Sequence, residues 1–315
     1  FCCDVKVPEH TFMAEGVIIS NCCEVVSADD SDVCNLGSIN MAAIKDLEDF
    51  KATVELASKF LVCGTMRGQM PDEKSRRVRE KNRRLGLGLM GLHEWLLQRG
   101  HQYGMNDELR TWMQAYVEQS ESAANQHCDR FFLSRPVAYR AIAPTGTIGI
   151  LAGSTTGIEP IFAVAYKRRY IDGNRETGIE RRMYQYYIDA GAQDIINRYS
   201  VDPNSIESAI DLAQNPIRRI KFQADMNDYI DMAISSTLNM PAWGSEHNND
   251  LCIDEYARAI ATYAPRLRGL TTYPDGARGG QPLVSCPYEE ATQHGLGVAY
   301  EENSENACKS GVCGI

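Results

Sequence analysis

The 315-residue sequence contains no apolar run of the roughly 18 residues that a membrane-spanning helix requires. It also has no surplus of positive charge, because 32 Lys and Arg residues stand against 42 Asp and Glu residues and leave a net charge of −10. Such a chain is poorly suited to displace counterions from phosphate backbones, so we expect no nucleic acid and no membrane among its partners. No secretory signal is recognisable at the start, which favours a cytoplasmic location.

Paired metal ligands are also missing, although cysteine is abundant. The sequence has 11 cysteines, and a chain this large without a secretory signal is a poor candidate for a disulfide framework. A zinc site needs closely spaced ligand pairs, and Cys308 and Cys313 have no second Cys or His pair nearby. We therefore expect no protein-bound metal, and redox chemistry is the favoured interpretation of the cysteines.

Apolar periodicity predicts several helices separated by extended segments. Residues 1–21 read as short extended pieces, and residues 143–160 as a strand with two small-residue loops. Helices are predicted over residues 51–66, 83–99, 107–132, 184–199, 217–237 and 249–263. Their buried faces are expected to include Phe60, Met66, Leu85, Leu89, Leu92, Leu96, Leu97 and Leu251. Strands that alternate with long helices favour an α/β domain.

The first motif with chemical content is an Asn–Cys step at the end of DVKVPEHTFMAEGVIISNC, residues 4–22. The Asn21 side chain can attack its own backbone carbonyl and cut the chain, and the Cys22 thiol can first accept an acyl group as a thioester. His10 can transfer the protons. The segment resembles the C-terminal splicing end of an intein, although Ser20 stands where most inteins have His. A plain edge hairpin is the alternative.

A second set of motifs follows this segment. Cys22 and Glu24 form a Cys-x-Glu pair, and Cys34 opens the run CNLGSIN. Further blocks are RLGLGLMGLHEW at 84–95, APTGTI at 143–148, GIEP at 157–160, SSTLNMP at 235–241, YPDG and RGGQP within 273–282, and CKSGVC at 308–313. In this order the blocks resemble the large catalytic chain of ribonucleotide reductase over residues 22–315.

The blocks also indicate a class within that family. Reductases that use a separate radical-generating subunit relay the radical through two adjacent tyrosines, and the comparable stretch LTTYP at 270–274 has one. Together with the PTGT loop and the late YPDG and RGGQP blocks, this resembles the adenosylcobalamin-dependent class. The class that needs a radical-generating partner remains the alternative. A rival function is that of a self-processing protein whose only chemistry is splicing.

The resemblance implies an α/β fold, namely the C-terminal part of a ten-stranded α/β barrel preceded by a short β-type intein tail. The domains would be an intein segment at 1–21, the barrel at 22–285 and a mobile redox tail at 286–315. The missing N-terminal parts of the reductase and of the intein would come from another segment. We expect residues 22–315 alone to be inactive, because unpaired barrel strands expose their edges.

The resemblance also implies roles for individual residues. Cys22 would carry a thiyl radical formed with adenosylcobalamin, and Glu24, on the same face of an extended segment, would be the general base. Cys34 would be a reductant that forms a disulfide with an upstream cysteine. Cys308 and Cys313 would reduce that disulfide by thiol exchange and be reduced by a thioredoxin- or glutaredoxin-like protein.

The loop Thr145-Gly146-Thr147 is the expected binding site for the phosphates of the substrate. Its backbone N–H groups and hydroxyls can converge on an anion, and the resemblance assigns it to a ribonucleoside di- or triphosphate. An ordinary turn is the alternative. The charged residues at 46–49, 76–79 and 93–94 are expected to lie on solvated helix surfaces.

Overall fold

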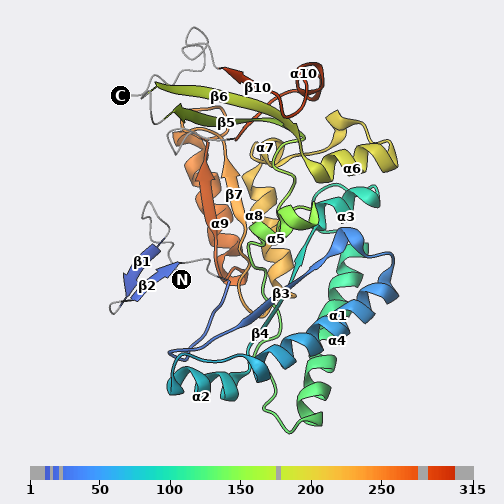
Figure 1. Ribbon diagram of the computed structural model, residues 1–315, viewed down its shortest axis with the longest axis vertical. Helices are drawn as coiled ribbons and strands as arrows, with labels where there is room; N and C mark the ends of the chain where they lie inside the picture. Colours follow the sequence, from blue (N-terminus) through green and yellow to red (C-terminus); the bar gives the residue numbers. More distant parts are fainter. Residues whose placement is uncertain (1–10, 15–16, 21–23, 175–178, 276–282, 302–315) are drawn as a thin grey trace.

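The computed structural model describes residues 11–14, 17–20, 24–174, 179–275 and 283–301 (Figure 1). Its helices are η1 (Met41–Ala43), α1 (Leu47–Arg67), α2 (Glu73–Asn82), α3 (Leu92–Gln98), α4 (Asp107–Arg130), α5 (Gly146–Ala152), α6 (Ala190–Tyr199), η2 (Pro203–Ser205), α7 (Ala209–Leu212), α8 (Pro216–Asn227), η3 (Asp250–Cys252), α9 (Ile253–Tyr263), η4 (Ala264–Arg266) and α10 (Tyr288–Gln293). None of the described helices is long and apolar enough to span a membrane.

Parallel strands form the centre of the molecule. They are β3 (Asn35–Asn40) beside β4 (Leu85–Met90), and β7 (Thr237–Met240) beside β8 (Thr271–Pro274). Isolated parallel bridges join Leu87 to Arg140 and Ile142 to Ile234, so two further extended segments continue the series beyond β4. Parallel strands connected through helices are the α/β architecture that the sequence predicts.

The main core lies between these strands and helices α1, α3 and α4. Trp95 and Trp112 meet edge to face with their ring centroids 4.9 Å apart, and Phe50 contacts Trp112 at 5.0 Å. The Tyr116 hydroxyl donates to the carbonyl of Leu87 on β4 at 2.6 Å. All of these rings are almost completely buried, so α4 is fixed against β4 by packing and by a satisfied polar contact.

A four-stranded antiparallel sheet stands apart from the parallel strands, at the top of Figure 1. Its order is β10 (Ala299–Glu301), β6 (Ile179–Ile188), β5 (Ala165–Asn174) and β9 (Leu283–Ser285). Two elements of this layer, α10 and β10, come from the segment 286–315 that was expected to be a mobile tail. A separate hairpin pairs β1 (Thr11–Ala14) with β2 (Val17–Ser20), in agreement with the extended pieces predicted there.

The predicted helix over 83–99 is wrong in its first half. Residues Leu85–Met90 form strand β4, and α3 begins only at Leu92. Every residue of β4 is buried, and a strand covered on both faces has a continuous apolar sequence rather than an alternating one. Leucines at such positions fit a helical period by coincidence, and Gly86 and Gly88 disfavour a helix.

Three other boundaries also differ from the prediction. Residues 143–160 contain helix α5 rather than a strand, and Tyr184 to Ile188 belong to strand β6 rather than to the helix that follows. Helix α8 ends at Asn227, because residues 232–235 instead form backbone hydrogen bonds with residues 140–142. Helices α1, α4 and α9 agree with their predicted positions within a few residues.

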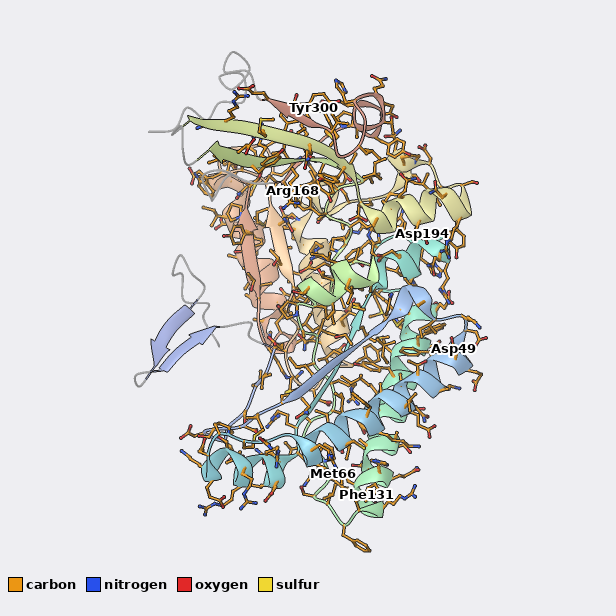
Figure 2. All side chains as sticks on the ribbon, in the orientation of Figure 1. Asp49, Met66, Phe131, Arg168, Asp194 and Tyr300 are labelled. Atoms are coloured by element: carbon orange, nitrogen blue, oxygen red, sulfur yellow. The ribbon has the colours of Figure 1, made fainter. Side chains whose placement is uncertain are left out.

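Several side chains that were predicted to be buried are exposed, and several that were predicted to be exposed are buried. Phe60 and Leu251 are exposed, and Met66 lies exposed near the end of α1 (Figure 2). In contrast, His93, Glu94 and Arg79, which were expected on solvated surfaces, are buried. The helical period alone does not distinguish the face that meets a neighbouring layer from the face that meets water.

Candidate functional site

Only part of the predicted site lies within the described residues. Glu24, Cys34 and the loop at 145–147 are described, whereas His10, Asn21, Cys22, Cys308 and Cys313 lie outside the described residues. The described part forms two regions, a packed cluster around Cys34 beside β3 and β4 and a cleft beside α5.

Glu24 is a buried carboxylate with an unused oxygen. Its residue is 8% exposed, and its Oε2 has no hydrogen-bond partner among the described residues. Its backbone carbonyl accepts the N–H of Ala233 at 3.1 Å, which holds the segment beside the interior strands. Because buried carboxylate oxygens are normally hydrogen-bonded, this oxygen remains available to a partner outside the described residues.

Cys34 lies just before β3, close enough to Glu24 for the charge of that residue to act on the thiol. Its side chain packs against Ala138, Ala141 and Met232. Burial raises the pKa of the Cys34 thiol to about 12; the positive charge of Arg84 opposes this effect, and the negative charge of Glu24 adds to it. The thiol is therefore protonated at neutral pH, as suits a hydrogen donor rather than a nucleophile.

Gly86 makes room for this sulfur on the neighbouring strand. A Cβ placed on Gly86 would lie 2.9 Å from Cys34 Sγ and would also collide with Leu36. Since Cβ atoms do not approach other heavy atoms so closely, any larger residue would displace the thiol or the strand. The first glycine of RLGLG, Gly86, is therefore required at its position for steric reasons.

Asp32 organises the loop between Glu24 and Cys34. Burial works against its ionisation, but hydrogen bonds from Ser27, Asn82 and Arg84 hold the pKa of Asp32 below its ordinary value. The Arg84 Nε donates to Asp32 at 2.9 Å, and Asn82 Nδ2 donates at 2.9 Å. This nearly buried ion pair joins the segment just before Cys34 to Arg84 at the start of β4.

The cleft beside α5 has a volume of about 530 Å³. It is lined by Pro144, Gly146, Ile150, Ser154, Thr155, Thr156, Glu159, Pro160, Phe162, Asp189, Ala209, Ser235, Thr237 and Asn239. Gly146 and Thr147 are exposed, whereas Thr145 is buried and adopts a left-handed conformation with φ 52°. The Thr145 Oγ1 accepts the N–H of Gly157 at 2.7 Å, so the predicted phosphate loop is anchored to the segment that follows α5.

The negative charge of Glu159 at the cleft is paired with a buried arginine. Glu159 accepts the N–H of Thr237 at 2.5 Å and pairs with the buried Arg219 at 2.6 Å. Arg219 also donates to the carbonyl of Thr237 at 2.9 Å and to the hydroxyl of Tyr103. No Lys or Arg belongs to the described lining, which also contains Glu159 and Asp189, so only backbone N–H groups and hydroxyls there could bind an anion.

Sequence reasoning missed two buried polar residues behind the cleft. The Nδ1 of His93 accepts the N–H of Ile161 at 2.9 Å, and burial lowers the pKa of His93 to about 3. Glu94 accepts the N–H of Thr155 at 2.5 Å and the Thr155 hydroxyl. The apolar residues Leu92, Trp95 and Leu96 on either side of the pair were the signal that this turn of the helix is buried on all sides.

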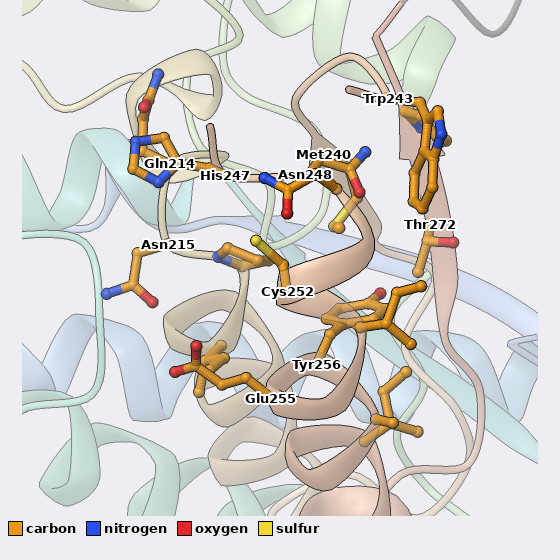
Figure 3. Close-up of a pocket in the computed structure, with 17 residues that line it drawn as sticks. Gln214, Asn215, Met240, Trp243, His247, Asn248, Cys252, Glu255, Tyr256 and Thr272 are labelled. Atoms are coloured by element: carbon orange, nitrogen blue, oxygen red, sulfur yellow. The ribbon is translucent and has the colours of Figure 1, made fainter. Parts of the chain in front are cut away.

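A second cleft, of about 550 Å³, lies where α8, α9 and the ends of β7 and β8 meet. Figure 3 shows Trp243, His247, Cys252 and Tyr256 around it. Met240, also in its lining, packs in one cluster with residues of α8 and α9. This cleft is thus formed on the helix-covered side of β7, and its described lining includes none of the described predicted site residues.

These features define an α/β barrel segment with a thiol and a carboxylate in its interior. The profile of the family described as ribonucleotide reductase, barrel domain, matches residues 8–127 and 135–265, and the chain belongs to this family. The match begins at residue 8, within the segment expected to belong to an intein.

Several curated proteins are similar to the chain. A vitamin B12-dependent ribonucleoside-diphosphate reductase of Mycobacterium tuberculosis (strain CDC 1551 / Oshkosh) is 28% identical over 302 residues, which cover 85% of this chain and 43% of that protein. A putative adenosylcobalamin-dependent ribonucleoside-triphosphate reductase of Mycobacterium phage D29 is 25% identical and covers 95% of this chain and 47% of its own length. The chain thus spans less than half the length of these relatives.

A solved structure agrees on the fold. The crystal structure of a B12-dependent (class II) ribonucleotide reductase superposes with a TM-score of 0.69 at 17% identity, and the match covers 86% of this chain and 41% of that one. This likeness confirms the α/β barrel type of fold that was predicted from the sequence.

Proposed function

We propose that this chain is the C-terminal part of an adenosylcobalamin-dependent ribonucleotide reductase, which converts ribonucleotides to 2′-deoxyribonucleotides. The observation that carries the proposal is that Glu24, whose buried Oε2 has no partner among the described residues, lies near the protonated Cys34 thiol. Relatives named as vitamin B12-dependent reductases support both the reaction and the cofactor.

The proposed reaction uses three side chains from the first part of the chain. A thiyl radical on Cys22 removes the 3′-hydrogen of the ribose, and Glu24 accepts the proton of the 3′-hydroxyl. The 2′-hydroxyl then leaves as water with a proton from the Cys34 thiol. Cys34 and an upstream cysteine supply two electrons and form a disulfide, and Cys22 returns the hydrogen to C3′.

Adenosylcobalamin is the proposed cofactor; when bound, it supplies an organic radical through homolysis of its cobalt–carbon bond. Within the described part of the chain, no group of three His, Cys, Asp or Glu side chains could hold a bare metal ion. A cobalt ion that arrives inside a corrin ring needs no such group, so the donor set is compatible with this cofactor. The chain's own task is to position Cys22 and to exclude water around it.

Two further parts complete the proposal. Backbone N–H groups and hydroxyls of Thr145, Gly146 and Thr147 would bind the substrate phosphates at the cleft, whose described lining includes Gly146 but neither threonine. Cys308 and Cys313 would reduce the disulfide of Cys34 by thiol exchange, with a thioredoxin- or glutaredoxin-like protein as the final reductant.

Splicing is the proposed role of residues 1–21. The support is the His10, Asn21 and Cys22 pattern, together with the β1–β2 hairpin that precedes the Asn–Cys step. To test it, the chain is mixed with a matching N-terminal intein half, and the ligated product is sought by mass spectrometry. An Asn21→Ala variant should yield no ligated product. Absence of ligation with the unaltered chain would refute this role.

The reductase proposal is tested with the full-length protein that contains this chain. Ribonucleoside di- and triphosphates are incubated with adenosylcobalamin and dithiothreitol, and deoxynucleotides are quantified by chromatography. Product that requires adenosylcobalamin is expected. Product that forms without it, but only with an added radical-generating subunit, would replace the proposed class with its alternative, and splicing without deoxynucleotide formation would favour the self-processing protein.

A further inference from the structure

Glu94 connects the start of α3 to the loop after α5. Its carboxylate accepts both the N–H of Thr155, at 2.5 Å, and the Thr155 hydroxyl. The carbonyl of Thr155 in turn accepts the N–H of Gly91 at 2.8 Å. All three hydrogen-bonding groups of Thr155 are therefore held by two residues at the beginning of α3.

Further hydrogen bonds connect the segment around Thr155 to the predicted phosphate loop. Two residues beyond Thr155, the N–H of Gly157 donates to Thr145 Oγ1 at 2.7 Å, and the N–H of Ser154 donates to the carbonyl of Gly149 at 3.0 Å. The loop that Glu94 holds is thus bonded both to the residue before α5 and to the middle of α5.

Helix α5 has little packing of its own to hold it. Gly149 is its single buried residue, whereas Ile148, Ile150 and Leu151 are exposed, the last at 87%. A helix without a buried apolar face gains little from burial of side chains. Its position therefore depends on the hydrogen bonds that lead back to Glu94.

The surroundings leave the carboxylate little freedom. Glu94 is 3% exposed, and a Cβ on Gly191 would lie 2.5 Å from its Oε1. Asp189, the residue that caps α6, is the charged group whose field reaches Glu94. Glu94 is not part of the described cleft lining, but it holds Thr155, which is. This arrangement is the one expected of a positioning residue.

We propose that Glu94 is a positioning residue that sets the conformation of the 145–157 segment for phosphate binding. This inference rests on the proposed function, in which that segment binds the substrate. Glu94 contacts no substrate; it acts through Thr155, Gly157 and Thr145.

The test uses the full-length protein and the variants Glu94→Ala, Glu94→Gln and Thr155→Val, with Glu48→Ala on the exposed surface of α1 as a control. Amide exchange of the 145–157 peptide is measured without nucleotide by mass spectrometry. Binding of cytidine di- and triphosphate is measured by equilibrium dialysis, and kcat and KM are measured separately.

Glu94→Ala is expected to accelerate exchange in 145–157 about tenfold and to raise Kd and KM about tenfold, with kcat within about threefold of the wild type. Gln retains an acceptor for the Thr155 N–H and is expected to restore binding. Thr155→Val removes only the hydroxyl contact, so it should give a smaller effect in the same direction, and it tests the inference even where Glu94→Ala does not fold.

Unchanged exchange in the Ala and Val variants would overturn the inference, and so would faster exchange with unchanged nucleotide binding. A wild-type protein that binds no nucleotide would defeat the proposed function and, with it, the positioning role. The two failures are thus distinguishable, because one appears in the wild type and the other only in the variants.

Discussion

The interior beside β3 and the cleft beside α5 differ in how their polar groups are satisfied. In the interior, Glu24 keeps a buried oxygen without a described partner, and Cys34 is a neutral thiol among apolar side chains. Glu159 in the cleft and Glu94 behind it accept hydrogen bonds from neighbouring segments, and of the described lining only the Ser154 hydroxyl is buried without a partner. An unsatisfied group is available for chemistry, whereas a satisfied one holds backbone in place.

The largest expected effect is that of Cys22→Ser in the full-length protein, which removes the proposed radical site from the interior. Oxygen does not form the proposed radical, so deoxynucleotide formation should fall by about 10⁴-fold or more, which is roughly 5 kcal/mol. Deoxynucleotides are quantified in single-turnover reactions. Cys63→Ser, at a half-buried thiol on α1, is the control, and product formation by the Cys22 variant near the wild-type rate would refute the proposed chemistry.

Glu24→Gln should have the next largest effect. The amide keeps the shape but does not accept the 3′-hydroxyl proton, so kcat should fall by about 10³-fold, a typical loss for a general base. Nucleotide binding, measured by equilibrium dialysis, should change little. Glu48→Gln, whose side chain is 82% exposed on α1, is the matched control; equal losses in both variants would contradict the role of Glu24.

The neutral state of Cys34 predicts slow alkylation. With burial raising its pKa to about 12, the thiolate fraction at pH 8 is small, and the higher nucleophilicity of that thiolate compensates only in part. Carboxamidomethylation by iodoacetamide should be on the order of 10²-fold slower than for glutathione. Peptide mass spectrometry measures the rate, which should rise with pH beyond pH 9. Alkylation at the glutathione rate would show an exposed thiolate instead.

Gly86→Ala should lower stability rather than remove a reactive group. The added methyl would lie 2.9 Å from Cys34 Sγ, and overpacking of a buried strand costs about 1–3 kcal/mol. The thermal unfolding midpoint is compared with that of Gly146→Ala, where a Cβ would meet no atom within 4 Å. A midpoint no lower than that of this control would mean that the interior is more loosely packed than the structure indicates.

The smallest expected effect concerns the pH dependence of stability at Glu94. Burial raises the pKa of Glu94, and the charge of Asp189 adds to the shift. The stability that the protonated acid contributes is therefore complete below its ordinary pKa of about 4.5 and is lost as pH rises through the folded value. Gln has no such loss, so the melting temperature of Glu94→Gln relative to wild type should increase by a few degrees from pH 4 to pH 8. A difference that is constant with pH would contradict the shift.

Much of the candidate site could be predicted because its motifs are short and contiguous. Cys34 in CNLGSIN, Glu24 two residues after Cys22, and the PTGT loop are recognisable without knowledge of the fold. Glu94 was not predicted as functional, because its role depends on Thr155, which lies 61 residues away along the chain. The antiparallel sheet of β5, β6, β9 and β10 was also missed; β9 and β10 are only three residues long, and the second half of β6 was read as part of the helix that follows.

The amino-acid sequence by itself determined the family, the acidic character of the chain and the thiol and carboxylate proposed for the reaction, because these depend on residue identity and close spacing. Only the tertiary structure decided that Leu85–Met90 is a strand, that His93 and Glu94 are buried, and that Cys34 is neutral beside Glu24. The physical reason is that burial from all sides removes the periodic contrast between apolar and polar residues. The pKa of a side chain and its partners then depend on segments that the local sequence does not contain.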